Sequence, residues 1–394
     1  MLNLLRQHQT LSRQELSELT GLSGAAITGV VGELIEEGWV VETRSGQPRG
    51  GRPPVLLEIA YESWHAAGVK VMEDRLEVIL TNLSTEVLAE RRVRLHQPSP
   101  EALVQSVGQA VRALLKETGR TSERLVGVGV GMAGVIDPRR GVCLYSPFFH
   151  WKEVPIKDLL EAELSRPVWV DNDVNAFAVA EMLFGRGQSA ENFLVVTVGR
   201  GIGAGFVIGG QVYRGHRGGA GEFGHTVSEV GGRPCECGKR GCLEAYVSEP
   251  ALLAQALERF PELRTELGAH QVEQLVNVAQ AGHQGLQALL AEAGTRLGVG
   301  LANLVNLFNP ELVVIGGEGV RLGERFFGPM KEALEQNAFN GLADGLSIYV
   351  DPWGDDAWAR GAAGLAIQKE VFADPMESSS ENQQTGTMAR ESGR

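Results

Sequence analysis

Three of the four cysteines in this 394-residue chain fall within eight positions, and no other feature of the sequence constrains the fold as strongly. Cys235, Cys237 and Cys242 follow His225, whereas Cys143 stands alone. This uneven grouping is a poor disulfide framework, but three thiolates and one imidazole are enough for a closed tetrahedral Zn²⁺ site. A filled shell leaves no place for an activated water, so we expect a structural zinc. The alternative is three reduced cysteines beside an unrelated histidine.

The charge balance limits what the chain binds through charge alone. The net charge is −13, and residues 1–60 contain five Arg and seven Glu. These values argue against a broad, charge-driven affinity for nucleic acid. No apolar run approaches the roughly 20 residues that span a bilayer, and the N-terminus lacks a signal-peptide pattern. We therefore expect a cytoplasmic protein without a membrane partner.

Residues 1–60 carry the signals of a winged helix-turn-helix. Ser12 and Glu15 have the spacing of a capping box, and the helix that begins there stops at Gly21. Ser23 is placed to cap a second helix, which ends at Gly38. Two extended runs, 39–42 and 55–59, flank a polar stretch rich in Gly, Pro and Arg. This order predicts a DNA-binding domain over residues 1–60.

The expected DNA contacts divide between the second helix and the wing. The helix positions nearest the major groove are Ser23, Gly24, Ala25 and Thr28, and no Arg or Lys lies between residues 14 and 43. Guanine reading by a basic residue of this helix is therefore excluded. Positive charge sits in the wing, where arginines fit a narrow minor groove, at Arg44, Arg49 and Arg52. The alternatives are a solvated basic loop, or a protein-contact role for residues 1–60.

From about residue 64 the pattern becomes that of an α/β domain, which we place at 64–372. Strand-like apolar runs alternate with the helical stretches 101–117 and 289–305; the runs are 76–80, 125–130, 168–170, 193–198 and 312–315. Two lobes of this domain are candidates for duplicates in fold. Residues 373–394 are rich in Ser, Glu, Gln and Gly, and this composition predicts a disordered tail.

Four motifs of the chain resemble the ROK family, which joins repressors, open reading frames and sugar kinases. They are Gly219-Ala-Gly-Glu-Phe-Gly-His225, Cys235-Glu-Cys-Gly-Lys-Arg-Gly-Cys242-Leu-Glu244, Asp171-Asn-Asp-Val-Asn175 and Gly199-Arg-Gly-Ile-Gly203. With the winged helix, the resemblance covers roughly residues 1–370 and is strongest to repressors of xylose, glucose and N-acetylglucosamine genes. It implies a two-lobed actin/hexokinase-like, that is ribonuclease H-like, sugar-kinase fold.

The resemblance also implies a sugar pocket, formed by Asn172, Asp173, Glu222, His225 and Glu244. Carboxylates accept hydrogen bonds from hydroxyls, and a zinc-bound histidine presents its second nitrogen to a ligand. In the kinases the residue matching Asp173 is the general base. The alternative for these polar residues is ordinary turns and caps. Family members read Pro-Asn-Leu before Gly-Trp where this chain reads Pro147-Phe-Phe-His-Trp151, which puts the identity of the ligand in doubt.

The phosphate side departs further from the kinase pattern. Kinases have Asp-x-Gly-Gly-Thr in the first hairpin, whereas this chain has Lys70, Met72, Glu73 and Asp74 at the Asp, Gly, Gly and Thr positions. The carboxylates of Glu73 and Asp74 would face the phosphate of ATP. Two like charges about 4 Å apart repel by about 4 kcal/mol at an effective dielectric of 20, so this substitution disfavours phosphate binding. In the second loop, Gly199, Gly201 and Gly203 persist beside Arg200. Arg200 either helps this loop to bind an anion or pairs with a nearby acid.

Together these features predict a sugar-responsive transcriptional repressor without kinase activity. Its expected partners are a double-stranded operator with an inverted repeat and a sugar or sugar-derivative effector. By resemblance we expect a homodimer or homotetramer. The first alternative is an ATP-dependent sugar kinase with a DNA-binding appendage. The second is a zinc-stabilised scaffold that binds a partner protein.

Overall fold

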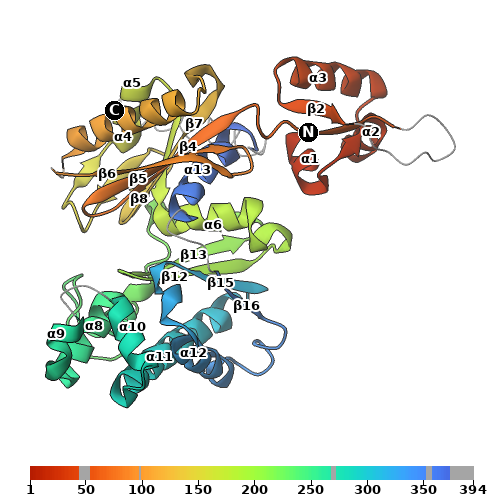
Figure 1. The fold of residues 1–394 in the computed structure, drawn as a ribbon. Helices are drawn as coiled ribbons and strands as arrows, with labels where there is room; N and C mark the ends of the chain where they lie inside the picture. Colours follow the sequence, from red (N-terminus) through yellow and green to blue (C-terminus); the bar gives the residue numbers. More distant parts are fainter. Residues whose placement is uncertain (44–53, 97–98, 268–271, 352–356, 373–394) are drawn as a thin grey trace, which may run out of the picture.

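The computed structural model describes residues 1–43, 54–96, 99–267, 272–351 and 357–372. Figure 1 shows a small N-terminal module beside one lobe of a larger two-lobed unit. The wing arginines Arg44, Arg49 and Arg52 and the tail 373–394 lie outside the described residues. No single described helix is long and apolar enough to cross a membrane; two consecutive helices, Arg13–Thr20 and Gly24–Glu36, meet that test only as a pair bent by 116°.

The N-terminal module contains the predicted helix-turn-helix. Helix α2 (Arg13–Thr20) begins at the capping box, where the Ser12 hydroxyl accepts the Glu15 N–H at 3.2 Å and the Glu15 carboxylate accepts the Ser12 N–H at 2.8 Å. It ends at Gly21, whose φ of 71° is left-handed. Helix α3 (Gly24–Glu36) follows, capped by Ser23. A bend of 116° between the two helices is in the range of DNA-binding helix-turn-helix units.

The rest of the module is a helix and a small antiparallel sheet. The sheet has the order β1-β3-β2, with β1 (Leu11–Ser12), β2 (Val40–Thr43) and β3 (Leu56–Ile59). Helix α1 (Leu2–His8) precedes it, and the sequence analysis did not predict this helix. Its Leu5 is 1% exposed and packs with Leu16 and Ile27 of the helix-turn-helix.

The first lobe is built on a five-stranded sheet with the order β6-β5-β4-β7-β11. Strands β4, β5 and β6 form an antiparallel meander, and β7 and β11 add in parallel to β4. Helices α4 and α5 cover one face. The bounds are β4 His65–Val71, β5 Arg75–Asn82, β6 Val87–Arg94, β7 Leu125–Met132, β11 Val168–Asn172, α4 Pro100–Glu117 and α5 Ile156–Leu164, with a small sheet of β8 Val135–Asp137, β9 Val142–Tyr145 and β10 Lys152–Val154.

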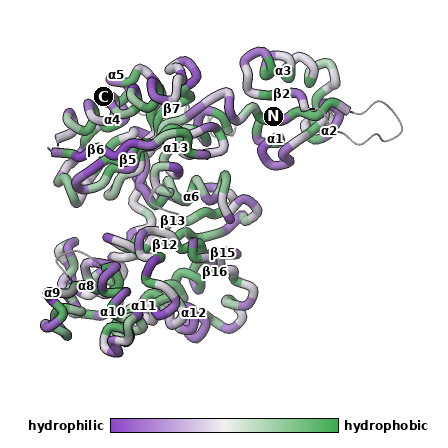
Figure 2. Tube along the Cα trace, viewed as in Figure 1, coloured by the Kyte–Doolittle hydropathy of each residue, from purple (hydrophilic) through white to green (hydrophobic). Residues whose placement is uncertain are grey.

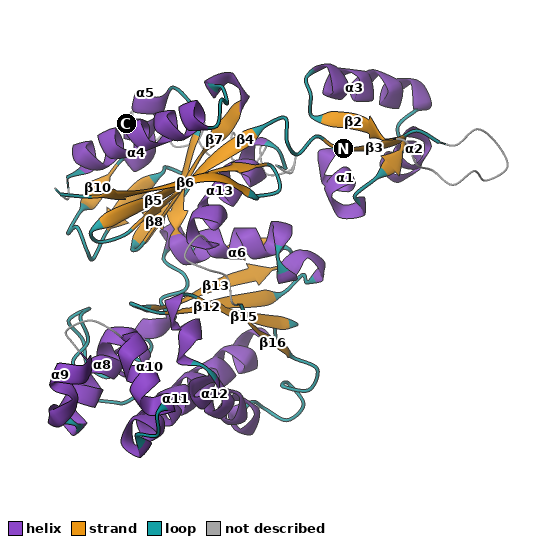
Figure 3. Cartoon of the chain, in the orientation of Figure 1, coloured by secondary structure: helices purple, strands orange, loops and turns teal. Residues whose placement is uncertain are grey.

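The second lobe repeats this topology with the order β14-β13-β12-β15-β16. A three-stranded antiparallel meander is again followed by two parallel strands, so the two lobes are duplicates in fold. Helices of the second lobe cover the face of this sheet that points away from the first lobe, as Figure 3 shows. The bounds are β12 Phe193–Val198, β13 Ile202–Ile208, β14 Gln211–Tyr213, β15 Leu312–Gly316, β16 Ser347–Val350, α7 Glu244–Val247, α8 Glu249–Arg259, α9 Arg264–Leu267, α10 Val272–Gln280, α11 Gln284–Phe308 and α12 Glu324–Asn337.

Two helices, α6 (Asp173–Phe184) and α13 (Ala357–Glu370), pack between the sheets. Helix α6 covers β12 and β13, while α13 lies on β4 and β7 and contacts α6. Figure 2 shows that the trace at α13 is largely hydrophobic. A Cβ at Gly68 or Gly129 would overlap the carbonyl oxygens of Ala359 and Ala362, so α13 meets the first sheet backbone to backbone. This close packing fixes α13 against β4.

Helix α13 also reaches the N-terminal module. Ala363, Ile367 and Phe372 share one apolar core with Leu5 of α1 and Leu57 of β3. The Phe372 carbonyl accepts a hydrogen bond from the Asn3 amide at 3.1 Å, and the Arg6 guanidinium lies 5.4 Å from the Phe372 ring.

A second contact lies at the junction of the two units. Trp39 stacks on Trp64 with ring centroids 4.1 Å apart, and the Arg124 guanidinium lies 4.6 Å from the Trp64 ring. The helix-turn-helix is therefore packed against the first lobe rather than tethered beside it.

Candidate metal centre and ligand pocket

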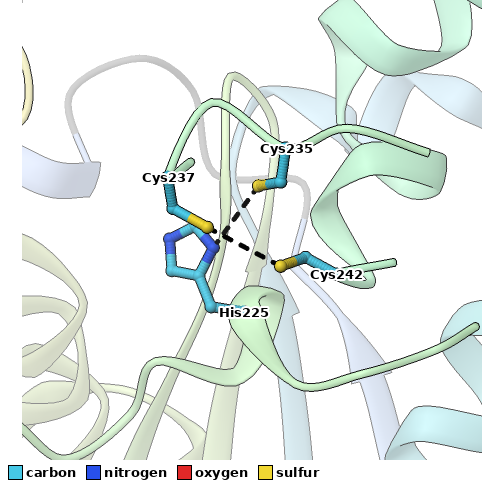
Figure 4. A group of neighbouring side chains, drawn as sticks. All are labelled: His225, Cys235, Cys237 and Cys242. Atoms are coloured by element: carbon cyan, nitrogen blue, oxygen red, sulfur yellow. Dashed lines mark hydrogen bonds between the residues drawn. The ribbon is translucent and has the colours of Figure 1, made fainter. Parts of the chain in front are cut away.

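The four predicted metal ligands converge in the second lobe. His225 ends the short 3-10 helix Phe223–His225, and the three cysteines follow on a loop that folds back through bridges between Val227 and Cys242 and between Pro234 and Arg240. Figure 4 shows the His225 ring among the three sulfur atoms. All four candidate ligand atoms lie within 4.8 Å of one another. The structure thus brings the predicted cluster together.

The spacing of these atoms fits a tetrahedral zinc ion. The Cys237 and Cys242 sulfurs are 3.7 Å apart, and the Cys235 sulfur is 3.7 Å from His225 Nδ1. For Zn–S and Zn–N bonds of about 2.3 and 2.0 Å, tetrahedral ligand atoms lie roughly 3.6 to 3.8 Å apart. Burial raises the pKa of Cys235 to about 12, so a thiolate there needs a cation beside it. The donor set could therefore hold a metal ion.

His225 lies between the cysteine sulfurs and the carboxylates of Glu222 and Glu244. His225 Nδ1 faces the sulfurs, while Nε2 lies 3.8 Å from a carboxylate oxygen of Glu222. The carboxylate of Glu244 lies 4.0 Å from Nδ1 and 3.9 Å from the Cys235 sulfur. Partial burial raises the pKa of Glu222, and the carboxylates of Glu244 and Asp173 raise it further against the opposing effect of His225. Three of the other predicted pocket residues, His225, Glu244 and Asp173, are therefore close enough to Glu222 to act on its charge.

The β11–α6 junction supplies the other two pocket residues. Asn172 is the N-cap of α6: its carbonyl oxygen accepts the Val174 N–H at 2.9 Å, and its amide donates to Gly134 at 3.0 Å. The Asn172 amide thus serves as a cap, the alternative considered for this residue. Asp173 is the first residue of α6, and its Oδ1 accepts the Val174 N–H at 3.0 Å. A helix N-terminus stabilises such a carboxylate.

The buried Asp171 ties this junction to the second lobe. Its carboxylate accepts hydrogen bonds from Arg214 Nε at 2.6 Å, from the Asn175 amide at 3.0 Å and from the Asn172 N–H at 2.8 Å. Arg214 follows β14, so this ion pair joins the two lobes beside the pocket.

The first hairpin, β4–β5, holds an ion pair that the sequence analysis missed. The Lys70 ammonium contacts Asp173 Oδ2, and the two side chains are 9% and 13% exposed. Lys70 Nζ also lies 4.1 Å from the centre of the Trp358 ring at the start of α13. The available signal was the single lysine of the buried strand β4, because a buried ammonium requires a partner. The turn itself carries Glu73 and Asp74, both exposed.

The second hairpin, β12–β13, keeps its glycine loop but surrounds it with acids. Arg200 pairs with Glu236 of the cysteine loop at 3.0 Å, and its guanidinium lies 5.7 Å from the Phe148 ring. Glu244 accepts the Ile202 N–H of the loop at 3.0 Å. A Cβ at Gly199 would clash with a carboxylate oxygen of Glu318, so this acid lies directly against the loop. Of the two alternatives for Arg200, the structure shows pairing with an acid.

The divergent segment 147–151 is largely committed to packing. Phe149 and Trp151 are buried, and their rings stack with centroids 4.5 Å apart. His150 is exposed and adopts a left-handed φ of 55°. The half-buried Phe148 turns its ring to Arg200 of the second lobe. This segment therefore presents an aromatic ring at the pocket where the family pattern has an amide.

The predicted DNA-contact residues of α3 lie at an open surface. Ser23, Gly24, Ala25 and Thr28 are all exposed. The Ser23 hydroxyl caps α3, and the Thr28 hydroxyl donates to the Gly24 carbonyl at 2.8 Å. Leu19, Leu22 and Val30 add exposed apolar surface, with exposures of 51%, 46% and 39%. The predicted wing contacts Arg44, Arg49 and Arg52 lie outside the described residues.

A winged helix-turn-helix packed against a two-lobed sugar-kinase-like domain defines a class of regulator built on a kinase fold. Residues 1–41 match the winged helix-turn-helix DNA-binding family, and residues 66–369 match the ROK family. The chain belongs to the ROK family.

Relatives of both kinds are similar to this chain. The xylose repressor of Caldicellulosiruptor bescii is 31% identical over 93% of this chain and 94% of its own length. The crystal structure of a ROK family transcriptional regulator, a homolog of the E. coli MLC protein, covers 91% of each chain at 26% identity with a TM-score of 0.80. A ROK family glucokinase from Streptomyces griseus, solved with glucose and AMPPNP, is 29% identical and covers 77% of this chain and 99% of its own, with a TM-score of 0.68.

Proposed function

We propose that this protein is a sugar-responsive transcriptional repressor of carbohydrate genes that binds double-stranded DNA and does not phosphorylate its effector. The observation that carries the proposal is the union of a helix-turn-helix with a kinase-like domain in which Lys70 contacts Asp173 and two acids, Glu244 and Glu318, lie against the second glycine loop. The similar xylose repressor and MLC-like regulator support it.

The DNA interface of this proposal combines α3 with the wing. The exposed start of α3 offers hydroxyls and small side chains to the major groove, and Arg44, Arg49 and Arg52 supply the phosphate and minor-groove contacts. Arg6 is not available for this role, because it packs on Phe372 and donates to the Leu183 carbonyl at 3.4 Å. A homodimer or homotetramer would present two such modules to an inverted repeat.

A structural Zn²⁺ is part of the proposal. His225, Cys235, Cys237 and Cys242 would hold the ion, and the ion would orient the histidine whose Nε2 faces Glu222. The effector-binding groups are then Asp173, Glu222, Glu244 and His225, with Asn172 capping the helix that carries Asp173. These groups suit a polyhydroxylated ligand, because carboxylates accept hydroxyl hydrogen bonds.

Helix α13 provides the proposed connection between effector and DNA. Its Trp358 lies over Lys70, the partner of Asp173, and the chain just beyond its other end carries Phe372, which contacts Asn3 and Arg6 of the DNA-binding module. A ligand that shifts Asp173 would thus act on an element that both sites contact. Coupling of this kind requires only that ligand and DNA favour different placements of α13.

The experiment is gel retardation of DNA from upstream of the protein's own gene, with and without D-xylose, D-glucose or N-acetyl-D-glucosamine. We expect specific retardation, a change in affinity with one sugar, and sharply weaker binding by Arg49→Ala/Arg52→Ala. Arg112→Ala/Arg259→Ala, which removes two exposed ion-paired arginines of the kinase-like domain, controls for net charge and should bind as the wild type does. Specific DNA binding unaffected by loss of both wing arginines would refute the wing contacts.

Phosphoryl transfer is the second candidate function, favoured by the presence of Asp173 and by the likeness to a glucokinase. A coupled assay with ATP and the sugars glucose, xylose, mannose and N-acetylglucosamine decides between the two. We expect no ATP-dependent turnover. Sustained turnover with any of these sugars would replace the repressor proposal with a kinase that carries a DNA-binding module.

A further inference from the structure

The Lys70–Asp173 pair is built into the packed interior of the molecule. Lys70 lies on β4, which is buried along its whole length and meets α13 backbone to backbone through Gly68. Its ammonium contacts Asp173 and faces the Trp358 ring, so three elements, β4, α6 and α13, meet at one charge. A buried ammonium without such partners would carry a large desolvation cost.

Both oxygens of the Asp173 carboxylate also have partners. One carboxylate oxygen contacts Lys70, and the other accepts the Val174 N–H at the positive end of α6. The facing charges from other elements are the carboxylates of Glu222 and Glu244, which belong to the same electrostatic cluster. Lys70 is therefore the cation in direct contact with Asp173, the acid nearest the N-terminus of α6.

A general base needs a carboxylate oxygen free to take the proton of the attacking hydroxyl, whereas one oxygen of Asp173 contacts the Lys70 ammonium and the other accepts the Val174 N–H. The same contact leaves a carboxylate able to accept a hydrogen bond from a hydroxyl. We propose that Lys70 is a positioning residue that converts the kinase base Asp173 into a fixed, charged hydrogen-bond acceptor for an uncharged sugar hydroxyl. The bound hydroxyl keeps its proton, so the effector is sensed without being consumed. This inference rests on the proposed sugar-binding function and deepens it.

The test is a double-mutant cycle on the full-length, zinc-loaded protein, with Lys70→Met, Asp173→Asn and the double variant. Lys70→Met keeps the length of the buried side chain and removes its charge. We expect it to lower the melting temperature, and we expect the double variant to recover most of that loss because the unpaired carboxylate is gone. Additive losses in the double variant would overturn the inference, since they would mean that Lys70 acts independently of Asp173.

Calorimetric titration with D-xylose and with D-glucose tests the ligand role. We expect Lys70→Met to weaken binding of the sugar that the wild type binds by about tenfold or more, the size of a hydrogen bond to a charged group. In the Asp173→Asn background the same substitution should change affinity by less than about twofold. Lys70→Arg, which keeps the charge, should retain most of the affinity and serves as the rescue variant.

The two readouts separate the inference from the proposed function. A wild-type protein that binds neither sugar contradicts the sugar part of the proposed function, whereas coupled melting temperatures would still support the pairing. Unchanged sugar affinity in Lys70→Met overturns the positioning role even if the repressor function stands. ATP-dependent turnover by the wild type would also overturn it, because Asp173 would then act as a base despite Lys70.

Discussion

The β4–β5 and β12–β13 hairpins hold the same place in two sheets of the same strand order, yet they have diverged in opposite ways. In the first lobe, residues 70–74 replaced the glycines and the acid of the kinase pattern, and Lys70 turned inward onto Asp173. In the second lobe, the glycine loop 199–203 survived, but Glu244 and Glu318 lie against it. The proposed loss of the phosphate side therefore rests on substitutions in one hairpin and on neighbouring acids in the other.

Burial explains why the two changes differ in kind. The first hairpin is packed against α13, so a new charge there had to find an internal partner, and Asp173 is that partner. The second hairpin borders the cysteine loop, where the exposed side chains of Arg200 and Glu236 form an ion pair. A buried pair reorganises the site around itself, whereas an exposed pair leaves its surroundings nearly unchanged.

The largest effect should follow removal of a ligand of the proposed metal site, which lies beside the second hairpin. Cys237→Ser takes away an exposed ligand, and we expect loss of bound zinc, a destabilisation of about 4 kcal/mol or more and loss of sugar binding. Elemental analysis, thermal melting and calorimetry measure these three. Cys143→Ser, a buried cysteine of the other lobe, should keep its zinc. Equal zinc content in both variants would show that the cluster does not bind zinc.

Acidification should expose the cost of burial in the first hairpin. His65 begins β4, is 1% exposed and shares a hydrogen bond of 2.8 Å with the Thr121 carbonyl; its other ring nitrogen is buried without a partner among the described residues. Burial lowers the pKa of His65 to about 4. Between pH 6.5 and 4 the unfolded chain therefore binds a proton that the folded protein does not.

As the pH is lowered from 6.5 to 4, the free energy of unfolding should therefore decrease by about 3 kcal/mol in total. Urea denaturation at pH 7, 6, 5 and 4 measures the slope. His65→Gln keeps a donor for the Thr121 carbonyl but cannot titrate, so its curve should be flatter by that amount. The same slope in both proteins would assign the acid sensitivity to other groups.

Removing acidic charges should have a smaller effect, on AMPPNP affinity, and this effect should differ between the two hairpins. Glu318→Gln removes a charge beside Gly199, and we expect about a tenfold gain in AMPPNP affinity, from a like-charge repulsion reduced by roughly 1.4 kcal/mol. Glu73→Gln/Asp74→Asn in the first hairpin should give no gain, because the side chains at positions 72 and 73 still occupy the places of the two kinase glycines. Glu324→Gln on α12 is the charge control. A gain from the first hairpin alone would reverse the comparison.

The smallest effect is expected at the surface pair of the second hairpin. Arg200→Ala removes an ion pair whose members are 47% and 68% exposed, so stability should change by less than about 1 kcal/mol. Thermal melting should show a shift within about 3 °C. The affinity of this variant for AMPPNP tests whether Arg200 binds an anion. We expect little change; strongly weakened binding would show that the loop holds an anion through Arg200.

Local sequence rules were enough where the controlling interactions are short in range. The capping box at Ser12 and Glu15, the left-handed Gly21 and the Ser23 cap all lie within four residues of their partners, and the structure has each of them. The cysteine cluster is also local, with three ligands in eight positions. Helix α1 was missed because its one fully buried residue, Leu5, packs on residues of later elements.

The sequence by itself determined the residue types of the site: a Cys₃His cluster, the acids of a sugar pocket and a first hairpin without glycines. Only the tertiary structure decided what those residues do to one another. Lys70 and Asp173 are 103 residues apart, and Gly199 and Glu318 are 119 apart. Trp358 lies near Lys70 because α13 packs on β4. Charges interact through distance in space and burial, and neither quantity can be read from spacing along the chain.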